Sequence, residues 1–341
     1  MEEQTLEKEE KKERKGPRQF VEKNGWLISA ILGVLSILSL LGTTVTYVIK
    51  VDGQKYATDI HLWDYFKGLY EFDWTMHITL GLIVLGIVMV LLHKLKKELD
   101  VAASMLFILA VTMLVLTREF FSNNYSIENL KSVKFGWGSA CSIAFSIGAS
   151  TFALSNNLIN NPIRTRDIAE DGILIAAAFV LNLIKLPIAT GGGSINFQML
   201  PLFLIALRHG PAHGLICGGI IYGLVTCLTD GWGFATYPFD YLIGFGSVMV
   251  LGYFKNLIFS KKQTNYNIKG EVFLLIACTL STLIRFVGST ASSIIVYQYS
   301  LQAAMVYNMI YIPVSGAIAA AVIMGAYGPL AMLNNRFPIR R

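Results

Sequence analysis

The sequence predicts an all-α integral membrane protein with about ten transmembrane helices, and three observations support this class. Hydrophobic residues make up 54% of the 341-residue chain and charged residues only 15%, with a mean hydropathy of +0.55, whereas soluble domains average about 25% charged residues. Apolar runs recur at close to the ~20 residues that a helix needs to cross a bilayer. Basic residues lie in short segments between these runs, which is typical of membrane proteins, so the net charge of +6 does not indicate a nucleic-acid partner.

Ten apolar runs are candidates for membrane spans. They cover residues 26–48, 76–93, 101–117, 136–156, 171–189, 197–207, 211–228, 238–254, 271–288 and 304–326. The sixth run is too short to cross the bilayer untilted, because a helix rises only 1.5 Å per residue. It therefore either begins inside the preceding loop or belongs to a broken helix.

The distribution of basic residues predicts the topology. With the N-terminus in the cytoplasm, 20 of the 28 Lys and Arg residues fall on the cytoplasmic side, six fall outside, and Lys185 and Arg285 lie within spans. The positive-inside rule then predicts a multi-pass protein of the cell membrane with both termini cytoplasmic. The same assignment brings three loops to the outer face, around Gly191, at residues 230–237 and at residues 289–299.

The most polar connection between spans divides the chain into two parts. The predicted parts are a disordered cytoplasmic tail (1–25), an accessory four-helix membrane domain (26–157), a cytoplasmic linker (158–170), a six-helix substrate-binding domain (171–330) and a basic cytoplasmic tail (331–341). The first tail is dense in Glu and Lys, which favours disorder. The external segment from Val51 to Trp74 is rich in aromatic residues, as expected of a belt at the membrane interface.

A break between the fifth and sixth spans is the first candidate site. Here an apolar helix gives way to Gly191-Gly192-Gly193-Ser194-Ile195-Asn196. Backbone that leaves helical geometry beside hydrocarbon must be buried in protein or line a wet cavity, because its polar groups need partners. Gly192, Gly193, Ser194 and Asn196 are therefore candidate ligand contacts. The alternative is a flexible loop between two helices.

Asp240 is the second candidate, because an acid at the end of a span is costly unless it is paired, hydrogen-bonded or hydrated. It could pair with Lys185 or Arg285, bind a proton or sodium ion, or balance a cationic ligand. Nearby aromatic residues favour the last reading, because ring faces attract cations and stack on planar rings. They are Tyr241, Trp232, Tyr237, Tyr297 and Tyr299. Asn196 and Asn308 add hydrogen-bond donors and acceptors, so the predicted ligand is a small, flat, cationic heterocycle.

The last six spans also carry a series of short motifs. They are Lys185-x-Pro187, Gly192-Gly193-Ser194-Ile195, Met199-x-Pro201, Ala206-Leu207-Arg208-x-Gly210, Gly214, Asp240-Tyr241 before Gly244-Phe245, Leu283-Ile284-Arg285-Phe286 and Tyr307-Asn308. Together they resemble the thiamine-specific substrate-binding (S) component of energy-coupling factor (ECF) transporters. The resemblance covers about residues 168–330 and none of residues 1–167.

This resemblance implies a six-helix bundle that binds thiamine near the outer face, with three outer loops closing over the ligand. It implies ligand contacts at Asp240, Tyr241, Tyr297 and Asn308. It also implies that small residues on the first helix of the bundle, here Gly172 and Ala176, pack against a transmembrane partner.

The sequence contains no Gly-Lys dipeptide and hence no P-loop. The chain therefore needs no cofactor of its own, and ATP would be hydrolysed by an ECF module with a transmembrane T component and two ATPases. The other expected partners are membrane lipids and thiamine or a related molecule.

Four positions depart from the family pattern. Ser289 stands where members usually carry a His, Ser293 replaces a small glycine, Tyr297 stands where Trp or Phe is common, and Ala303 replaces a Tyr. The missing His removes a ring-stacking partner, so a thiamine precursor or another vitamin is the alternative ligand. Ser289 is kept as a candidate contact.

Three other classes of function give different expectations. A stand-alone secondary transporter would use Asp240 and Lys185 as a relay, and a scaffold would depend on the first four spans. An enzyme is not predicted, and neither is a metal site. His209 and His213 lie in the segment His-Gly-Pro-Ala-His, which lacks the Glu of HExxH, and Pro211 interrupts its helix.

Overall fold

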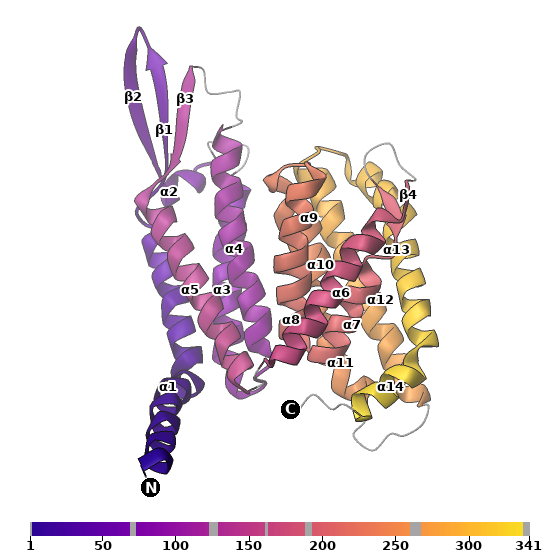
Figure 1. Cartoon of the computed structure of the whole chain (residues 1–341). Coiled ribbons are helices and arrows are strands. Elements are labelled where there is room, and N and C mark those ends of the chain that lie inside the picture. Colours follow the sequence, from indigo (N-terminus) through magenta and orange to yellow (C-terminus); the bar gives the residue numbers. More distant parts are fainter. Residues whose placement is uncertain are drawn as a thin grey trace. The chain divides into compact units, whose positions relative to one another are not determined.

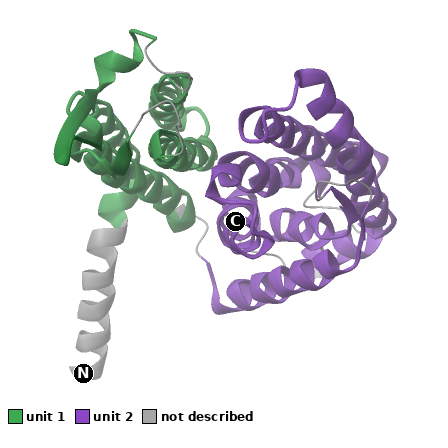
Figure 2. Ribbon diagram, turned by 90° about the horizontal axis from the view of Figure 1, so that it is seen from above, with its two compact units in different colours: residues 1–162 green, residues 163–341 purple. Residues whose placement is uncertain are grey.

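The structure is a computed structural model that describes residues 2–68, 73–122, 129–160, 163–187, 193–259 and 267–336 (Figure 1). It divides into two compact units, unit 1 (Met1–Pro162) and unit 2 (Ile163–Arg341) (Figure 2). This division falls within the segment 158–170 that the sequence indicates as a linker. Each unit is described separately.

The described part of the chain is mostly helical, and eight of its helices are long and apolar enough to cross a membrane. They cover Gln19–Ser39, Trp74–Leu91, Leu99–Ser122, Trp137–Ile159, Pro211–Asp230, Phe234–Ile258, Ile268–Ile295 and Leu301–Gly325. The other two predicted spans, 171–189 and 197–207, correspond to weaker candidates. Four of the first seven residues of helix α6 (Thr165–Leu183) are charged, and α7 (Met199–His209) has only 11 residues. The count of ten spans thus stays a prediction.

Four long helices form the body of unit 1. They are α1 (Glu2–Ser39), α3 (Trp74–Leu91), α4 (Leu99–Ser122) and α5 (Trp137–Asn160), accompanied by the short α2 (Leu62–Tyr65) and η1 (Leu92–Lys94). Helix α5 packs against α1 and α4, and α3 packs against α1 and α4. Buried apolar side chains such as Ile83 and Phe107 fill the space between them. Buried hydroxyls also join the helices, as where Ser36 Oγ lies 2.7 Å from Ser142 Oγ.

A small antiparallel sheet in unit 1 departs from the all-α prediction. Strands β1 (Thr43–Val51), β2 (Gln54–His61) and β3 (Leu130–Phe135) pair in the order β2-β1-β3. The first predicted span, 26–48, is therefore too long, because α1 ends at Ser39 and β1 begins four residues later. The hairpin turn is Asp52-Gly53, where both residues have positive φ. This dipeptide is typical of a tight turn between two antiparallel strands, and β1 is rich in β-branched residues. The interpretation of residues 51–74 as an aromatic belt missed this signal.

The two terminal segments are more helical than composition predicts. Helix α1 begins at Glu2, within the segment 1–25 that is predicted to be disordered. Glu, Lys, Arg and Gln all have high helix propensity, so a charge-rich segment can continue a helix. Helix α14 (Tyr327–Arg336) likewise extends into the predicted tail 331–341. Asn334 accepts a hydrogen bond of 2.8 Å from the Arg208 guanidinium, which ties α14 to α7.

Unit 2 is built from helices with one short hairpin. Its elements are α6, β4 (Lys185–Pro187), β5 (Ser194–Asn196), α7, α8 (Pro211–His213), η2 (Gly214–Tyr222), α9 (Gly223–Asp230), η3 (Phe234–Thr236), η4 (Tyr237–Ile243), α10 (Gly244–Gly246), α11 (Met249–Ile258), α12 (Ile268–Ile295), α13 (Leu301–Gly325) and α14. Elements α8, η2 and α9 form one continuous helical segment, and η3 to α11 form another.

These two continuous segments pack closely because glycines line their contact. A Cβ on Gly218 would lie 2.7 Å from the Phe245 carbonyl oxygen, and one on Gly219 would lie 3.0 Å from the Gly246 Cα. Small residues let helix backbones approach in this way. Elements η2 and η4 are π-helical, a conformation that is rare and often found beside functional sites because it redirects side chains. Element η4 supplies Asp240 and Tyr241 to the cavity described next, and Tyr222 of η2 donates a hydrogen bond to Gln198, which also lines that cavity.

Candidate ligand-binding cavity in unit 2

Unit 2 contains a cavity of about 390 Å³, within the range of small-molecule sites. Eight of the ligand contacts predicted from the sequence line it. They are Asp240, Tyr241, Asn308, Tyr297, Trp232, Ser289, Ser194 and Asn196. These residues come from β5, η4, α12 and α13 and from the loops after α9 and α12, so the fold gathers positions spread over more than 100 residues.

The glycine-rich break flanks this cavity. Strands β4 and β5 pair antiparallel on either side of the break, with Lys185 opposite Asn196. The Gly193 amide donates a hydrogen bond of 2.8 Å to the Tyr307 hydroxyl, and a Cβ on Gly193 would lie 2.9 Å from the Tyr311 ring. A side chain at this position would therefore collide with two tyrosines of α13. Gly192 lies outside the described residues.

Asp240 is hydrogen-bonded rather than ion-paired. The Ser292 hydroxyl donates to its Oδ2 at 2.5 Å, and Ser289 also interacts with this carboxylate. Within the described residues, no ion pair joins Asp240 to Lys185 or Arg285. The Arg285 guanidinium instead lies over the Phe245 ring, with Cζ 5.0 Å from its centroid. The structure thus does not show the hypothesised pairing of Asp240 with Lys185 or Arg285.

Tyr241 follows Asp240 on π-helical η4 and reaches a second acid. Its hydroxyl donates a hydrogen bond of 3.1 Å to Asp230 Oδ2. Asp230 ends α9, where Gly231 adopts a left-handed conformation with φ of 73°, which is common at helix C-termini. The cavity therefore holds two carboxylates, Asp230 and Asp240, and two basic side chains, Lys185 and Arg285.

A row of aromatic rings runs along one side of the cavity. Successive centroids are 6.3 Å apart for Trp232 and Tyr297, 6.3 Å for Tyr297 and Tyr299, and 6.2 Å for Tyr299 and Tyr307. Tyr311 continues the row at 5.6 Å from Tyr307. Burial, together with the negative charge of Asp240, raises the pKa of Tyr297 to about 12. Its hydroxyl therefore stays protonated and remains a hydrogen-bond donor.

The two predicted asparagines differ in how they are satisfied. Asn308 donates to Ser293 Oγ at 3.0 Å and to the Ala304 carbonyl at 2.9 Å, and its Oδ1 accepts from the Tyr311 hydroxyl at 2.9 Å. Its amide is thus fully engaged within the protein, and it holds Tyr311 in place. Asn196 is also buried, but its Oδ1 has no hydrogen-bond partner. Because a buried acceptor without a partner is costly, Asn196 is suited to receive a donor from a ligand.

Sequence reasoning missed several residues that line the cavity. They are Asn182, Gln198, Thr226, Asp230 and Tyr311, whereas Phe245 and Tyr307 were noted as motif residues but not as contacts. Tyr307, Asn308 and Tyr311 could have been grouped, because residues three or four apart share one face of a helix. Asn182 and Gln198 carry no comparable signal. The Gln198 side chain is held in place by Tyr222, whose hydroxyl donates to Gln198 Oε1 at 2.6 Å.

The small residues predicted to meet a partner lie at the surface of unit 2. Gly172 and Ala176 on α6 are exposed, and a Cβ on Gly172 would meet nothing within 4 Å. Gly316 on α13 shows the opposite behaviour, because a Cβ there would lie 2.3 Å from Thr282 Oγ1. Packing inside the unit therefore explains Gly316 but not Gly172.

Comparisons with known proteins point to one class of transporter. Residues 168–336 match the sequence model of the thiamine transporter protein family (Thia_YuaJ). The chain is 28% identical over 173 residues to the thiamine transporter ThiT of Bacillus subtilis, covering 45% of this chain and 86% of that protein. It is 27% identical over 144 residues to an uncharacterized protein of Pyrococcus woesei, covering 42% of this chain and 88% of that protein. No solved structure matches the chain. The segment that contains the cavity is thus similar to thiamine transporters, which supports a role in thiamine transport.

Proposed function

We propose that this protein is the substrate-capture component of an ATP-driven vitamin importer and that unit 2 binds thiamine in its cavity. The observation that carries this proposal is the cavity itself, which gathers an acid, a row of aromatic rings and an unpartnered amide oxygen. Thiamine joins a positively charged thiazolium ring to a planar aminopyrimidine ring, so each of these features has a counterpart in the ligand.

Each group has a distinct role in the proposed complex. The carboxylate of Asp240 balances the positive ring, and the tyrosines beside it add cation-π attraction of about 0.5–2 kcal/mol per favourable ring. Asn196 Oδ1 accepts a hydrogen bond from the ligand amino group, which relieves an unsatisfied buried acceptor. The hairpin of β4 and β5, with Gly193 against Tyr307, forms one wall of the opening.

Partner subunits would supply the energy for import, since the sequence has no P-loop. The exposed face around Gly172 and Ala176 is the proposed contact with the T component of an ECF module, because small residues allow a second helix to approach closely. The proposal places the cavity at the outer face of the cell membrane and both termini in the cytoplasm, which follows the distribution of basic residues.

Two titrations of the purified full chain test this function. Calorimetry with thiamine should give one binding site with a Kd below about 1 µM, equivalent to about 8 kcal/mol. Intrinsic fluorescence should fall on binding, because Trp232 lines the cavity and the other four tryptophans lie in residues 1–162. A Trp232→Phe variant should lose most of this signal while its calorimetric titration persists. Absence of heat well above micromolar thiamine contradicts the choice of ligand.

The remaining alternatives give different results in the same assays. A thiamine precursor or another vitamin would bind in place of thiamine and would be found by mass spectrometry of molecules that co-purify with the protein. A stand-alone secondary transporter would take up substrate into liposomes with an ion gradient and no other subunit. The proposal requires that such liposomes stay inactive until the ATPase module and its membrane partner are added.

A further inference from the structure

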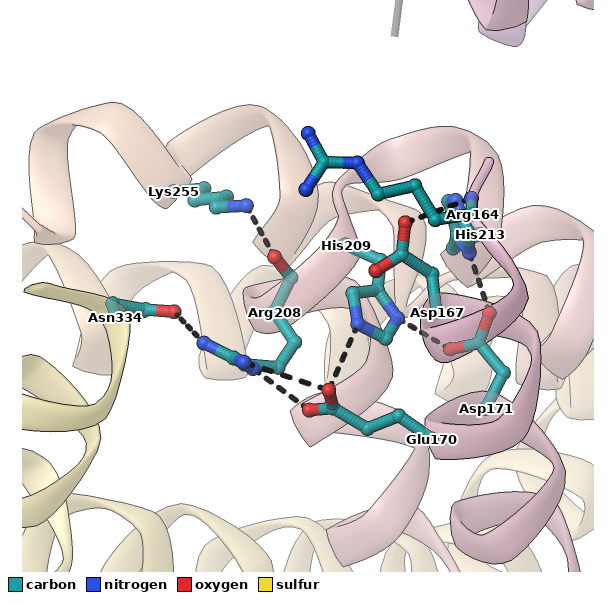
Figure 3. Close-up of polar contacts among 9 residues, drawn as sticks. All are labelled: Arg164, Asp167, Glu170, Asp171, Arg208, His209, His213, Lys255 and Asn334. Carbon is teal, nitrogen blue, oxygen red and sulfur yellow. Dashed lines mark hydrogen bonds and ion pairs between the residues drawn. The ribbon is translucent and has the colours of Figure 1, made fainter. Parts of the chain in front are cut away.

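A second polar cluster lies in unit 2, away from the thiamine cavity. Figure 3 shows it at the start of α6 and the junction of α7 with α8, and it includes Asp171, His209 and His213. Asp171 is 11 residues before Asn182, which lines the cavity on the same helix, so about 16 Å of helix separates the two sites. The proposed transport function makes no use of this cluster.

The cluster brings three good metal ligands together in a buried place. The His209 Nδ1 lies 2.6 Å from Asp171 Oδ1, and the His213 Nδ1 lies 2.5 Å from Asp171 Oδ2. One ligand atom from each of the three residues falls within 4.8 Å of the others, and all three residues are buried. Two imidazoles and a carboxylate are a common ligand set for zinc and other divalent transition metals.

The chain makes this arrangement by means of a sharp turn. Gly210 has φ of 103°, and Pro211 begins the next helical segment, so His209 and His213 belong to different helices. Their ring centroids are nevertheless only 4.9 Å apart. The prediction of no metal site was based on this broken helix and on the missing Glu between the histidines. The acid is instead supplied by α6, 38 residues before His209 in the chain.

The surroundings of His209 give a second indication of a ligand. Its buried Nε2 has no hydrogen-bond partner among the described residues and lies 3.5 Å from Oε2 of Glu170, while Nδ1 faces Asp171. A metal-bound histidine usually donates its other ring N–H to a carboxylate, and Glu170 stands where it would accept from Nε2 when Nδ1 binds an ion.

Glu170 is itself held in position for this role. The Arg208 Nε donates to Glu170 Oε1 at 2.7 Å, and Arg208 also bonds to Asn334 of α14. Lys255 of α11 donates to the Arg208 carbonyl, as Figure 3 shows. The outer contacts of the cluster thus join α6, α7, α11 and α14.

We infer that Asp171, His209 and His213 bind one divalent transition-metal ion, for which Zn²⁺ is the best match in ligand type. Tetrahedral bonds of about 2.0–2.1 Å place neighbouring ligand atoms about 3.3 Å apart. The present separations of 2.6 Å and 2.5 Å need to open by less than about 1 Å. The ion would join α6 to the α7–α8 turn.

The test uses the full chain carrying an affinity tag without histidines, stripped with EDTA. Metal analysis after incubation with Zn²⁺ and gel filtration should find one ion per chain. Incubation with Co²⁺ should give the visible absorption bands of a tetrahedral complex. The melting temperature should rise with Zn²⁺, because an ion that binds only the folded state stabilises it.

Matched variants locate the ion. Asp171→Asn and His213→Gln should each weaken Zn²⁺ binding by more than about 100-fold, which exceeds the usual effect of losing an outer contact. Asp167→Asn, one turn earlier on α6, and His77→Gln in unit 1 should bind Zn²⁺ like the unmodified chain. Gel filtration and the melting temperature in EDTA show that each variant is folded.

Two results would overturn the site. The first is a stripped chain that takes up no ion between pH 6 and 8, which would show that Asp171, His209 and His213 only bond to one another. The second is Co²⁺ binding that Asp171→Asn and His213→Gln leave unchanged, which would show binding elsewhere. Neither readout depends on thiamine, so failure of the metal site is distinguishable from failure of the proposed transport function.

Discussion

Replacing Asp240 by Asn tests the central electrostatic claim, because it removes a charge from the cavity while keeping its shape. The Asn side chain can still accept the hydrogen bond from Ser292 that Asp240 accepts at 2.5 Å, so the fold should lose less than about 1 kcal/mol. A ligand cation about 5 Å from the carboxylate would be attracted by about 3 kcal/mol at an effective dielectric constant of 20. Lys185 and Arg285 line the same cavity and offset part of this attraction.

The expected loss is therefore about 1.4–2.8 kcal/mol, or 10- to 100-fold in Kd for thiamine. Calorimetry on the purified full chain measures this change directly. The matched ligand is thiochrome, an uncharged tricyclic relative of thiamine, whose affinity should change less than about threefold because the Coulomb energy is absent. The matched protein control is Asp52→Asn at the tip of the β1–β2 hairpin in unit 1.

Two outcomes would refute this reasoning. An Asp240→Asn protein that is folded and binds thiamine normally would show that the carboxylate is only a structural partner of Ser292. Equal losses for thiamine and thiochrome would show that the substitution changes the shape of the cavity rather than its charge. The melting temperature of each variant separates these results from simple unfolding.

Three further predictions concern other positions. Ser289→His introduces the ring that family members usually carry at this buried position beside Asp240. Stacking on this ring should strengthen thiamine binding by about 1 kcal/mol, or roughly fivefold in Kd. Weaker binding in calorimetry would mean that the cavity requires the small side chain of Ser289. Gly172→Leu adds a side chain at a position where a Cβ would meet nothing within 4 Å. The melting temperature and the Kd for thiamine should therefore stay unchanged, while thiamine uptake with the ECF module should be lost. Unchanged uptake would show that this face does not contact the T component. Gly316→Leu should destabilise unit 2 by about 1–3 kcal/mol through overpacking against Thr282, seen as a lower melting temperature, and an unaltered melting temperature would contradict the packing described.

The membrane helices were largely predictable, because the apolar content of a span is a local property. Eight of the ten predicted spans coincide with long apolar helices. The short run before Arg208 is confirmed as a short helix of 11 residues. The predicted span 26–48 was wrong after Ser39, where hydrophobicity alone cannot distinguish a buried helix from a β-strand. The run of β-branched residues in β1 and the Asp52-Gly53 turn carried that information.

The cavity was predictable for a different reason. Asp240 and the glycine-rich break place polar groups where hydrocarbon tolerates them only if they are satisfied, and such features are expected at sites. The aromatic residues were predicted because their rings attract cations. What could not be predicted was how these groups are satisfied. The Asn308 side-chain amide is hydrogen-bonded to Ser293, Ala304 and Tyr311. The Oδ1 atom of Asn196, by contrast, has no hydrogen-bond partner. The two side chains are identical in sequence terms and differ only in their neighbours.

By itself, the sequence determined the membrane class, the approximate spans and the residues that gather around one cavity, because hydropathy and charge act along the chain. Only the tertiary structure decided which partners those residues meet. Asp171 and His209 are 38 residues apart in the chain but are hydrogen-bonded. Gly172 and Gly316 are both glycines within helices, yet a Cβ would meet nothing at Gly172 and would collide with Thr282 at Gly316. Such contacts depend on how helices approach one another in three dimensions, which no spacing along a single chain encodes.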